Sequence, residues 1–396
     1  MTSDATTPVI INGARTPFGR FRGALAPLSA TQLGSHAIRA ALERSGVPAD
    51  AIDAVIIGQV IQAGAGQGPA RQASIGAGIG WDVPTVTINK LCLSGLTAVI
   101  DAARLIRTGE ARFVVAGGQE SMTNAPHLLL GSRESFGFGD RLLKDSLNHD
   151  GLLDPFDGLL MGAATEQGNA SRQIGREEQD AVAARSHQRA DAASRSGLFA
   201  QEIASFEIPQ RRGPAVTVET DEGIRGDTTE EALSTLRPAF SPTGTITAGS
   251  SSPLSDGAAM LVIASKEAAI SAGLDWIAEI GAPGQVAGPD GSLHSQPSAA
   301  IRRALLREGI AVAQLDLVEI NEAFASVVIQ SARDLGIDTA RINQEGGAIA
   351  LGHPVGASGA RLALHLAYAL KRRGGGTGVA ALCGGGGQGD ALILRV

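Results

Sequence analysis

Apolar positions along this chain alternate between two patterns. Residues 8–12 and 54–58 are short apolar runs, which are typical of buried strands. Between them, residues 29–45 carry apolar side chains at helical spacing, and Ser29 stands where a helix N-cap is expected. Strand-like and helix-like segments continue to alternate in this way, which predicts an α/β protein with helices layered on sheets.

The same order of elements occurs near both ends of the chain. Each part contains a Ser-Gly pair at the start of a helix, Ser94-Gly95 in the first and Ser358-Gly359 in the second. This parallel predicts two similar α/β halves. The expected elements are strands at 83–89 and 113–118 around a helix at 95–107, then helices at 298–308 and 357–372 with strands at 315–321, 377–387 and 391–396.

The region between the halves, about 121–252, has a different texture. Glycines, prolines and charges crowd residues 131–158 and 209–230, and the expected helix at 176–195 has mixed charge, typical of a solvated face. Long excursions from a compact domain are usually lids or binding loops. We expect this region to cover a site.

Composition limits the possible functions. The 396 residues are 43% hydrophobic and 18% charged, enough for a large core and for two or three domains. Glycine is abundant, with 52 residues, but follows no collagen-like period. The net charge of −7 argues against nucleic acid or an anionic membrane as a partner.

Targeting and redox features point to the cytoplasm. The first ten residues do not form a signal peptide, and no apolar run reaches the ~18 residues of a membrane helix. Two cysteines in the whole chain exclude a disulfide framework and a cysteine-rich zinc site. We expect a cytoplasmic protein with reduced thiols and no metal.

Both cysteines lie in settings that suit chemistry. Cys92 follows a predicted strand and precedes a predicted helix, where amide N–H groups favour a thiolate. Cys383 ends a predicted strand and is followed by four glycines, which would let backbone amides approach a reacting atom. For each thiol the alternative is an inert, buried small side chain.

Two further segments carry candidate polar groups. Asn321 and Glu322 follow a predicted strand, where α/β proteins place site residues, although a helix cap explains them equally well. His353 lies in a glycine-rich turn and is either a base or a turn residue. The glycines at 384, 386 and 389 spell a dinucleotide fingerprint, but no helix follows them to hold a pyrophosphate, so that interpretation fails.

Together these segments resemble the thiolase family along nearly the whole chain, and most closely its acetyl-CoA C-acetyltransferase branch. Several separate motifs in the right order make a chance resemblance untenable. The matching stretches are NGARTPFG (12–19), NKLCLSG (89–95), AGGQESMTNAPH (116–127), DEGIR (221–225), TITAGSSSPLSDGAA (245–259), VEINEAF (318–324), GGAIALGHPVGASG (346–359) and ALCGGGGQGDA (381–391).

The resemblance implies a role for each catalytic residue. Cys92 matches the nucleophile that becomes acylated, and His353 matches the histidine that activates it and binds a thioester oxygen. Asn321 matches the asparagine that holds a water beside that histidine, and Cys383 matches the acid/base cysteine. Gly385 would lend its backbone N–H to an oxyanion hole shared with Cys92.

The resemblance also implies a coenzyme A site, with departures from the family pattern. Leu160-Met161 replaces the usual His-Met pair, and Ser250-Ser251-Ser252-Pro253 replaces the usual Asn-Ala-Ser-Gly. Ser252 still matches the serine that faces the pantetheine, whereas Leu160 opens the question of acyl-chain preference. The expected substrate contacts are Ser252, Ala248, Arg225, Met161, Leu160, Ala323 and Phe324.

In architecture, the resemblance implies the thiolase fold, a layered αβαβα sandwich of two halves with mixed sheets, plus a loop domain. We expect an N-terminal half from 4–122 and 253–275, a loop domain at 123–252 and a C-terminal half at 276–396. The loop domain would cover coenzyme A and serve oligomerisation. A homotetramer, as a dimer of dimers, is expected.

The activity implied is the reversible condensation of two acetyl-CoA molecules to acetoacetyl-CoA and CoA, with no cofactor besides the coenzyme A substrate. A degradative 3-ketoacyl-CoA thiolase with longer substrates is the alternative within the family. A non-catalytic acyl-CoA or lipid-binding protein would lack Cys92, His353 or Cys383. A carrier-protein-dependent ketoacyl synthase would have a Cys-His-His site, against which Asn321 and Cys383 speak.

Overall fold

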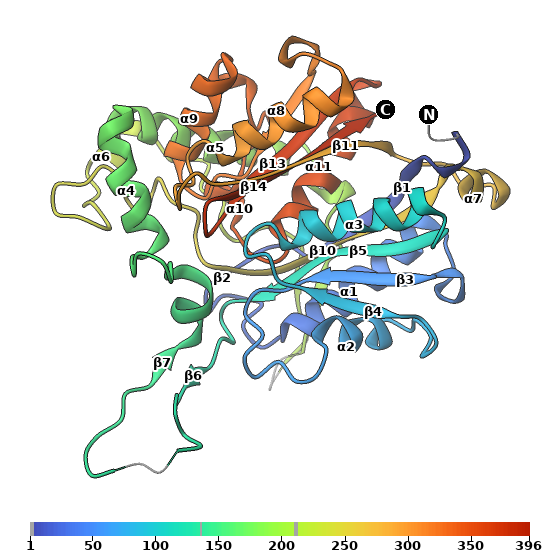
Figure 1. Ribbon diagram of the computed structural model, residues 1–396, viewed down its shortest axis with the longest axis horizontal. Coiled ribbons are helices and arrows are strands. Elements are labelled where there is room, and N and C mark those ends of the chain that lie inside the picture. Colours follow the sequence, from blue (N-terminus) through green and yellow to red (C-terminus); the bar gives the residue numbers. More distant parts are fainter. Residues whose placement is uncertain (1–3, 135–136, 210–212) are drawn as a thin grey trace.

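The computed structural model describes residues 4–134, 137–209 and 213–396. It shows two halves, each a sheet with helices, and a region of residues 122–254 that runs along one side of them (Figure 1). Inner strands of the sheets are buried along their whole length, as the apolar runs predicted.

The four strands of the C-terminal half follow the same order as the first four of the five strands in the N-terminal half. In the N-terminal half the order is β1-β10-β5-β3-β4, and in the C-terminal half it is β11-β14-β13-β12, with matching parallel and antiparallel pairs. The predicted duplication is therefore confirmed by topology. The strands are β1 (Pro8–Arg15), β3 (Ala54–Gly58), β4 (Thr85–Ile88), β5 (Phe113–Ser121), β10 (Ser255–Ser265), β11 (Ala278–Ala287), β12 (Leu317–Ile320), β13 (Thr377–Gly384) and β14 (Gln388–Arg395), with β2 (Gly19–Arg20) paired to β10.

The two sheets are joined into one. The first strand of each half, β1 and β11, pair antiparallel through Val9–Glu279 and Ile10–Ala278. Neither β10 nor β11 is among the strands that the hydrophobic pattern predicted. In β11, Pro283 and Gly284 are residues that usually interrupt strands, and they are accommodated beside an irregularity in the pairing between Ile280 and Pro283.

Helices cover both outer faces of the sheets and fill the space between them. Helix α1 (Ala30–Ser45) begins at Ser29, as predicted, with a complete capping box to Gln32. It packs with α2 and α7 outside the first half, while α8 and α9 cover the second half. The ranges are α2 (Pro69–Gly76), α7 (Lys266–Ser271), α8 (Gln296–Glu308), α9 (Ala325–Leu335) and the short α10 (Ala348–Leu351).

The middle layer consists of α3 (Ser94–Thr108) and α11 (Ser358–Arg373), which pack against each other between the two sheets (Figure 1). The two Ser-Gly pairs lie at this contact. A Cβ atom on Gly95 would stand 2.8 Å from the Gly356 carbonyl oxygen, and one on Gly359 would stand 2.5 Å from the Leu96 nitrogen. Only glycine allows the two helices to approach this closely. The turn before α3 and the turn before α11 therefore lie next to each other.

The region from 122 to 254 is built from short elements with long connections. The hairpin β6 (His127–Leu128) and β7 (Lys144–Asp145) projects away from the body (Figure 1). The region also contains a short π-helix (Asn148–Leu152), α4 (Met161–Arg172), α5 (Arg176–Arg195), a 3-10 helix (Phe199–Gln201), β8 (Phe206–Ile208), β9 (Val216–Val218) and α6 (Glu230–Ser234). Among the described residues no helix is long and apolar enough to span a membrane.

Candidate active site

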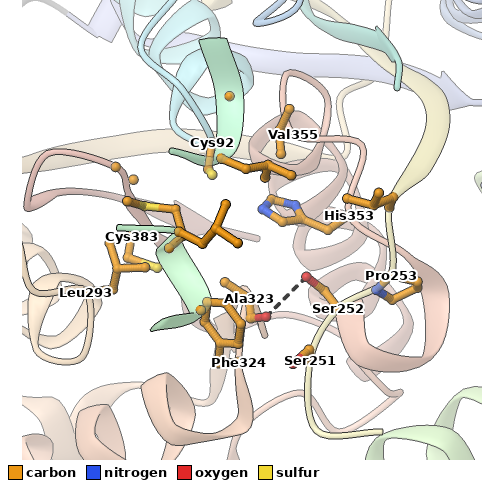
Figure 2. A pocket seen from close by; sticks show the side chains of 18 of the residues that line it. Cys92, Ser251, Ser252, Pro253, Leu293, Ala323, Phe324, His353, Val355 and Cys383 are labelled. Atoms are coloured by element: carbon orange, nitrogen blue, oxygen red, sulfur yellow. Dashed lines mark hydrogen bonds between the residues drawn. The ribbon is translucent and has the colours of Figure 1, made fainter. Parts of the chain in front are cut away.

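Cys92 lies on a tight turn between β4 and α3. Leu91 has a left-handed backbone (φ 52°), which is uncommon for a branched side chain, and Asn89 Oδ1 accepts a hydrogen bond from its N–H at 3.1 Å. The hydroxyl of Ser94 accepts from the Lys90 N–H and donates to the Leu91 carbonyl. These contacts fix the turn, so the sulfur of the half-buried Cys92 points into the cavity (Figure 2).

The Cys92 thiol is neutral in the resting protein. Burial raises its pKa to about 11, although the backbone N–H groups of Cys92 and Gly385 act in the opposite direction. The negative charge of Glu120 adds to the increase. Cys92 therefore needs a base before it can act as a nucleophile, and the Gly385 N–H is placed to stabilise negative charge at the reacting centre.

His353 is a neutral imidazole with a defined orientation. Burial, followed by the charge of Arg361, lowers its pKa to about 3. Ser358 Oγ lies 2.6 Å from His353 Nδ1 and donates its own proton to the Pro354 carbonyl at 3.0 Å, so it must accept from Nδ1–H. Nε2 then carries the lone pair and faces the site, with Asn321 Nδ2 at 3.4 Å.

Cys383 approaches the same cavity from the end of β13. Its side chain is buried, and burial together with the nearby Cys92 raises its pKa well above the ordinary value for a thiol. Figure 2 shows Cys92, Cys383 and His353 pointing into one space from three different segments of the chain. A nucleophilic thiol, a neutral imidazole and a thiol of very high pKa form an arrangement suited to acyl transfer with proton exchange.

A mainly apolar cavity of about 180 Å³ surrounds these groups. Leu160, Met161, Ala323 and Phe324 line it as expected, and Ser252 Oγ donates to the Ala323 carbonyl at 3.2 Å (Figure 2). Six further apolar side chains that were not predicted also line the cavity: Met122, Leu152, Phe240, Leu254, Leu293 and Val355. Met122, Leu254 and Val355 lie inside the matching stretches, which is a signal that could have found them. Leu152, Phe240 and Leu293 have no local signal that separates them from core residues.

A second cavity of about 320 Å³ adjoins the first, since Ser251, Pro253 and Leu254 line both. Ala248 and Arg225 lie in this second cavity, not beside Cys92. Arg20 also lines it; it was missed, although its place directly after the NGARTPFG motif is a signal that could have found it.

Acidic residues of the DEGIR stretch join it to the NGARTPFG segment, and both stretches lead into residues that line the second cavity. Asp221, which opens the DEGIR stretch, accepts two hydrogen bonds from the guanidinium of Arg15 at 2.7 and 2.9 Å and one from the Phe18 N–H. Its neighbour Glu222 accepts from the Arg20 N–H at 2.8 Å. Because DEGIR is tied to the NGARTPFG segment in this way, Arg225 and Arg20 share one cavity.

The structure thus divides the predicted site residues into two groups. Cys92, His353, Cys383 and Gly385 line the first cavity with the acyl-side contacts. Asn321 is not among the lining residues but contacts His353 Nε2. Within the described residues, no group of three or more His, Cys, Asp or Glu side chains could hold a metal ion.

Comparison with known proteins identifies the family. The model of the thiolase N-terminal domain matches residues 8–267, and that of the thiolase C-terminal domain matches residues 274–396. The chain therefore belongs to the thiolase family, and it has the thiolase fold. This agrees with the resemblance found in the motifs.

Individual relatives match along almost the whole chain. A protein of Mycolicibacterium smegmatis named probable acetyl-CoA acetyltransferase is 57% identical, covering 98% of this chain and 100% of the relative. The acetyl-CoA acetyltransferase of Pseudomonas aeruginosa is 46% identical, covering 98% of each. The crystal structure of the Bacillus anthracis acetyl-CoA acetyltransferase superposes with a TM-score of 0.95 at 37% identity, over 98% of both chains.

Proposed function

We propose that this protein is an acetyl-CoA C-acetyltransferase that condenses two acetyl-CoA molecules reversibly to acetoacetyl-CoA and CoA through acetyl-Cys92. The observation that carries the proposal is the convergence of Cys92, His353 and Cys383 on one cavity, with the Gly385 N–H facing the Cys92 sulfur. The names of the relatives support the same activity. A non-catalytic binding protein would have no need for this arrangement.

In the first half-reaction, His353 Nε2 takes the proton of the Cys92 thiol while the sulfur attacks the acetyl carbonyl carbon. The bond from that carbon to the CoA sulfur breaks, and Cys383 gives its proton to the departing sulfur. A thiol of high pKa suits this, because it holds its proton until the leaving group develops charge. The products are acetyl-Cys92, CoA, an imidazolium at His353 and a thiolate at Cys383.

In the second half-reaction, the Cys383 thiolate removes a proton from the methyl group of a second acetyl-CoA. The resulting carbanion attacks the carbonyl carbon of acetyl-Cys92, and the Cys92 sulfur leaves with the proton held by His353. Asn321 Oδ1 is buried and has no protein partner in the described part of the chain. This supports a role for Asn321 in holding a water near the thioester oxygen.

The test is mass spectrometry of the enzyme after incubation with acetyl-CoA. We expect one acetyl group, located on the peptide containing Cys92. Cys92→Ser loses nearly all turnover, because an alkoxide forms far less readily than a thiolate. Cys383→Ala is the matched variant. It still acetylates at Cys92, but more slowly because the CoA sulfur leaves without a proton from Cys383, and it fails to complete condensation. A label found only on Cys383 would reverse the two roles.

We also propose a short-chain preference. Met161 and Phe324 line the cavity, and we expect them to close the space beyond a two-carbon acyl group. Leu160, which is 39% exposed, replaces the usual histidine with an apolar wall. Each buried CH₂ contributes about 0.8 kcal/mol, so one open methylene position would favour longer substrates severalfold. Acetoacetyl-CoA should be cleaved with a kcat/KM at least as high as that of 3-ketohexanoyl-CoA.

A tenfold advantage for the C6 or C8 substrate would replace this proposal with the degradative 3-ketoacyl-CoA thiolase. Leu160→His should in that case shift the preference back toward the short chain.

The second cavity is proposed to take the nucleotide end of coenzyme A, with Arg225 near the adenine. Arg225→Ala is then expected to raise KM for acetyl-CoA more than it lowers kcat, because the contact is equal in the ground and transition states.

We further propose a cytoplasmic homotetramer, built as a dimer of dimers. Two exposed apolar surfaces support association with further copies. One is the edge of the sheet at β4, where Val86 is 49% exposed and Trp81 is 79% exposed nearby. The other is the β6–β7 hairpin, which exposes Leu130 and Leu142. Sedimentation velocity gives the oligomeric state directly, and a monomer would contradict the proposal.

A further inference from the structure

The segment that carries His353 is held on both sides by buried carboxylates that the mechanism above does not use. Glu322, from the loop after β12, contacts the segment four residues before the histidine. Glu120, from the end of β5, contacts it three residues after the histidine. One carboxylate belongs to each half of the molecule, and both are nearly or fully inaccessible to solvent.

Glu120 joins three segments around the site. Its Oε2 accepts from the N–H groups of Gly356 at 3.0 Å and Val60 at 2.9 Å, and its Oε1 accepts from the Ile61 N–H at 3.2 Å. A Cβ atom on Gly356 would stand 2.8 Å from Oε2, so the contact depends on glycine at this position. Val355, the neighbour of Gly356, lines the cavity beside Cys92.

Glu322 makes the corresponding contacts on the other side. Its Oε2 accepts from the Ile349 N–H at 3.0 Å and from the Ser186 hydroxyl at 2.6 Å, and its Oε1 accepts from Asn343 Nδ2 at 2.8 Å. Gly347 packs directly on the carboxyl group, since its Cβ would lie 2.2 Å from Glu322 Cδ. Asn321, which contacts His353, directly precedes Glu322 in the chain.

We propose that Glu120 and Glu322, here called the clamp carboxylates, are positioning residues that set His353 relative to Cys92 and Asn321. Each accepts three hydrogen bonds, one from the His353 segment and two from other parts of the chain, so it holds that segment in place without touching the reacting atoms. Misplacing a reacting group by about 1 Å costs on the order of 100-fold in rate, which is the size of effect expected here. The proposal rests on the cysteine-dependent acetyl transfer proposed above.

The experiment compares three variants of one clamp carboxylate. Glu120→Ala removes all three acceptor contacts. Glu120→Asp keeps a carboxyl group but withdraws it by one methylene. Glu120→Gln keeps the length and one oxygen for Gly356 and Val60. We expect the rate of Cys92 acetylation by acetyl-CoA to fall about 100-fold in Glu120→Ala. The loss should be larger in Glu120→Asp than in Glu120→Gln, with KM for acetyl-CoA within about threefold of wild type in all three.

Asp53 provides the matched control, because it does a similar structural task at the opposite end of the same two strands. Its carboxylate accepts from the backbone N–H groups of Arg112 at 2.7 Å and Phe113 at 2.9 Å, where β5 begins. Asp53→Ala should lower the thermal midpoint while leaving the rate of Cys92 acetylation unchanged. If Glu120→Ala does not fold, the proposal is still tested by the other two variants, since it requires a higher acetylation rate in Glu120→Gln than in Glu120→Asp.

Three outcomes overturn the assignment. One is acetylation of Glu120→Asp or Glu120→Ala at the wild-type rate. Another is a fall in the acetylation rate of Asp53→Ala equal to that in Glu120→Ala. The third is a loss that appears in KM alone. Each of them requires that the wild-type enzyme acetylates Cys92. A wild-type enzyme that takes no acetyl group contradicts the proposed function instead, and the two failures are thus distinguished.

Discussion

Replacing Asp390 with asparagine should destabilise the protein strongly, because it breaks an ion pair between the two halves. Asp390 is fully buried on β14, and its Oδ1 lies 2.7 Å from Lys90 Nζ in the turn that carries Cys92. Its Oδ2 accepts from the Thr97 hydroxyl at 2.7 Å. This one carboxylate therefore ties the nucleophile turn and α3 to the C-terminal sheet.

The size of the stability loss depends on which contacts Lys90 and Thr97 keep in the variant. Removing one partner of a buried ion pair costs about 3–5 kcal/mol, mainly because the other charge stays behind unpaired. The Lys90 side chain is 22% exposed and retains some access to water, and the asparagine oxygen still serves as an acceptor for Thr97 or Lys90. We therefore expect Asp390→Asn to lower the free energy of unfolding by about 3 kcal/mol.

Chemical denaturation followed by far-UV circular dichroism measures this loss, at one fixed protomer concentration because association would add to stability. The control is Asp191→Asn, which breaks the pair with Arg195. That guanidinium is 79% exposed, so the expected loss is below about 0.5 kcal/mol. If Asp390→Asn unfolds within about 1 kcal/mol of wild type, the buried pair does not hold the halves together as argued.

Two further predictions concern titration. Because burial raises the pKa of Cys92 to about 11, the rate of its alkylation by iodoacetamide in the free enzyme should keep rising from pH 7 to pH 10, and a plateau below pH 9 would contradict this. Burial also raises the pKa of Glu319 to about 7, so the folded state holds this proton more tightly than the unfolded chain does. The stability that results is fully present below about pH 4.5 and is lost as pH rises through 7. Glu319→Gln should therefore gain about 3 kcal/mol relative to wild type between pH 4.5 and 7.5, and parallel stability curves for the two proteins would refute the assignment.

Local sequence signals predicted the elements whose residues carry their own pattern. The helix at Ala30–Ser45 was found because its cap and its apolar face lie in one stretch of chain. Strand β11 was not found, because pairing with distant strands overrides the weak strand propensity of its glycine, alanine and proline residues. Strand β10 does contain a continuous apolar run at 258–264, a local signal that was overlooked. The pairing of β1 with β11, which makes one sheet of two, has no local signal at all.

The sequence by itself determined the chemistry available to this protein. It contains two cysteines, and each stands at the end of a predicted strand within a motif that resembles the thiolase family. Reactive groups can be recognised in this way because their backbone setting is local: a turn, a glycine run or a helix start. The tertiary structure alone decided the environment of these groups. Burial, which depends on the packing of both halves, raised the pKa of the thiols and lowered that of His353. Distant parts of the chain likewise supply the apolar wall around Phe240 and Leu293 and the carboxylates on either side of the His353 segment. Contacts between distant segments leave no pattern in a single sequence.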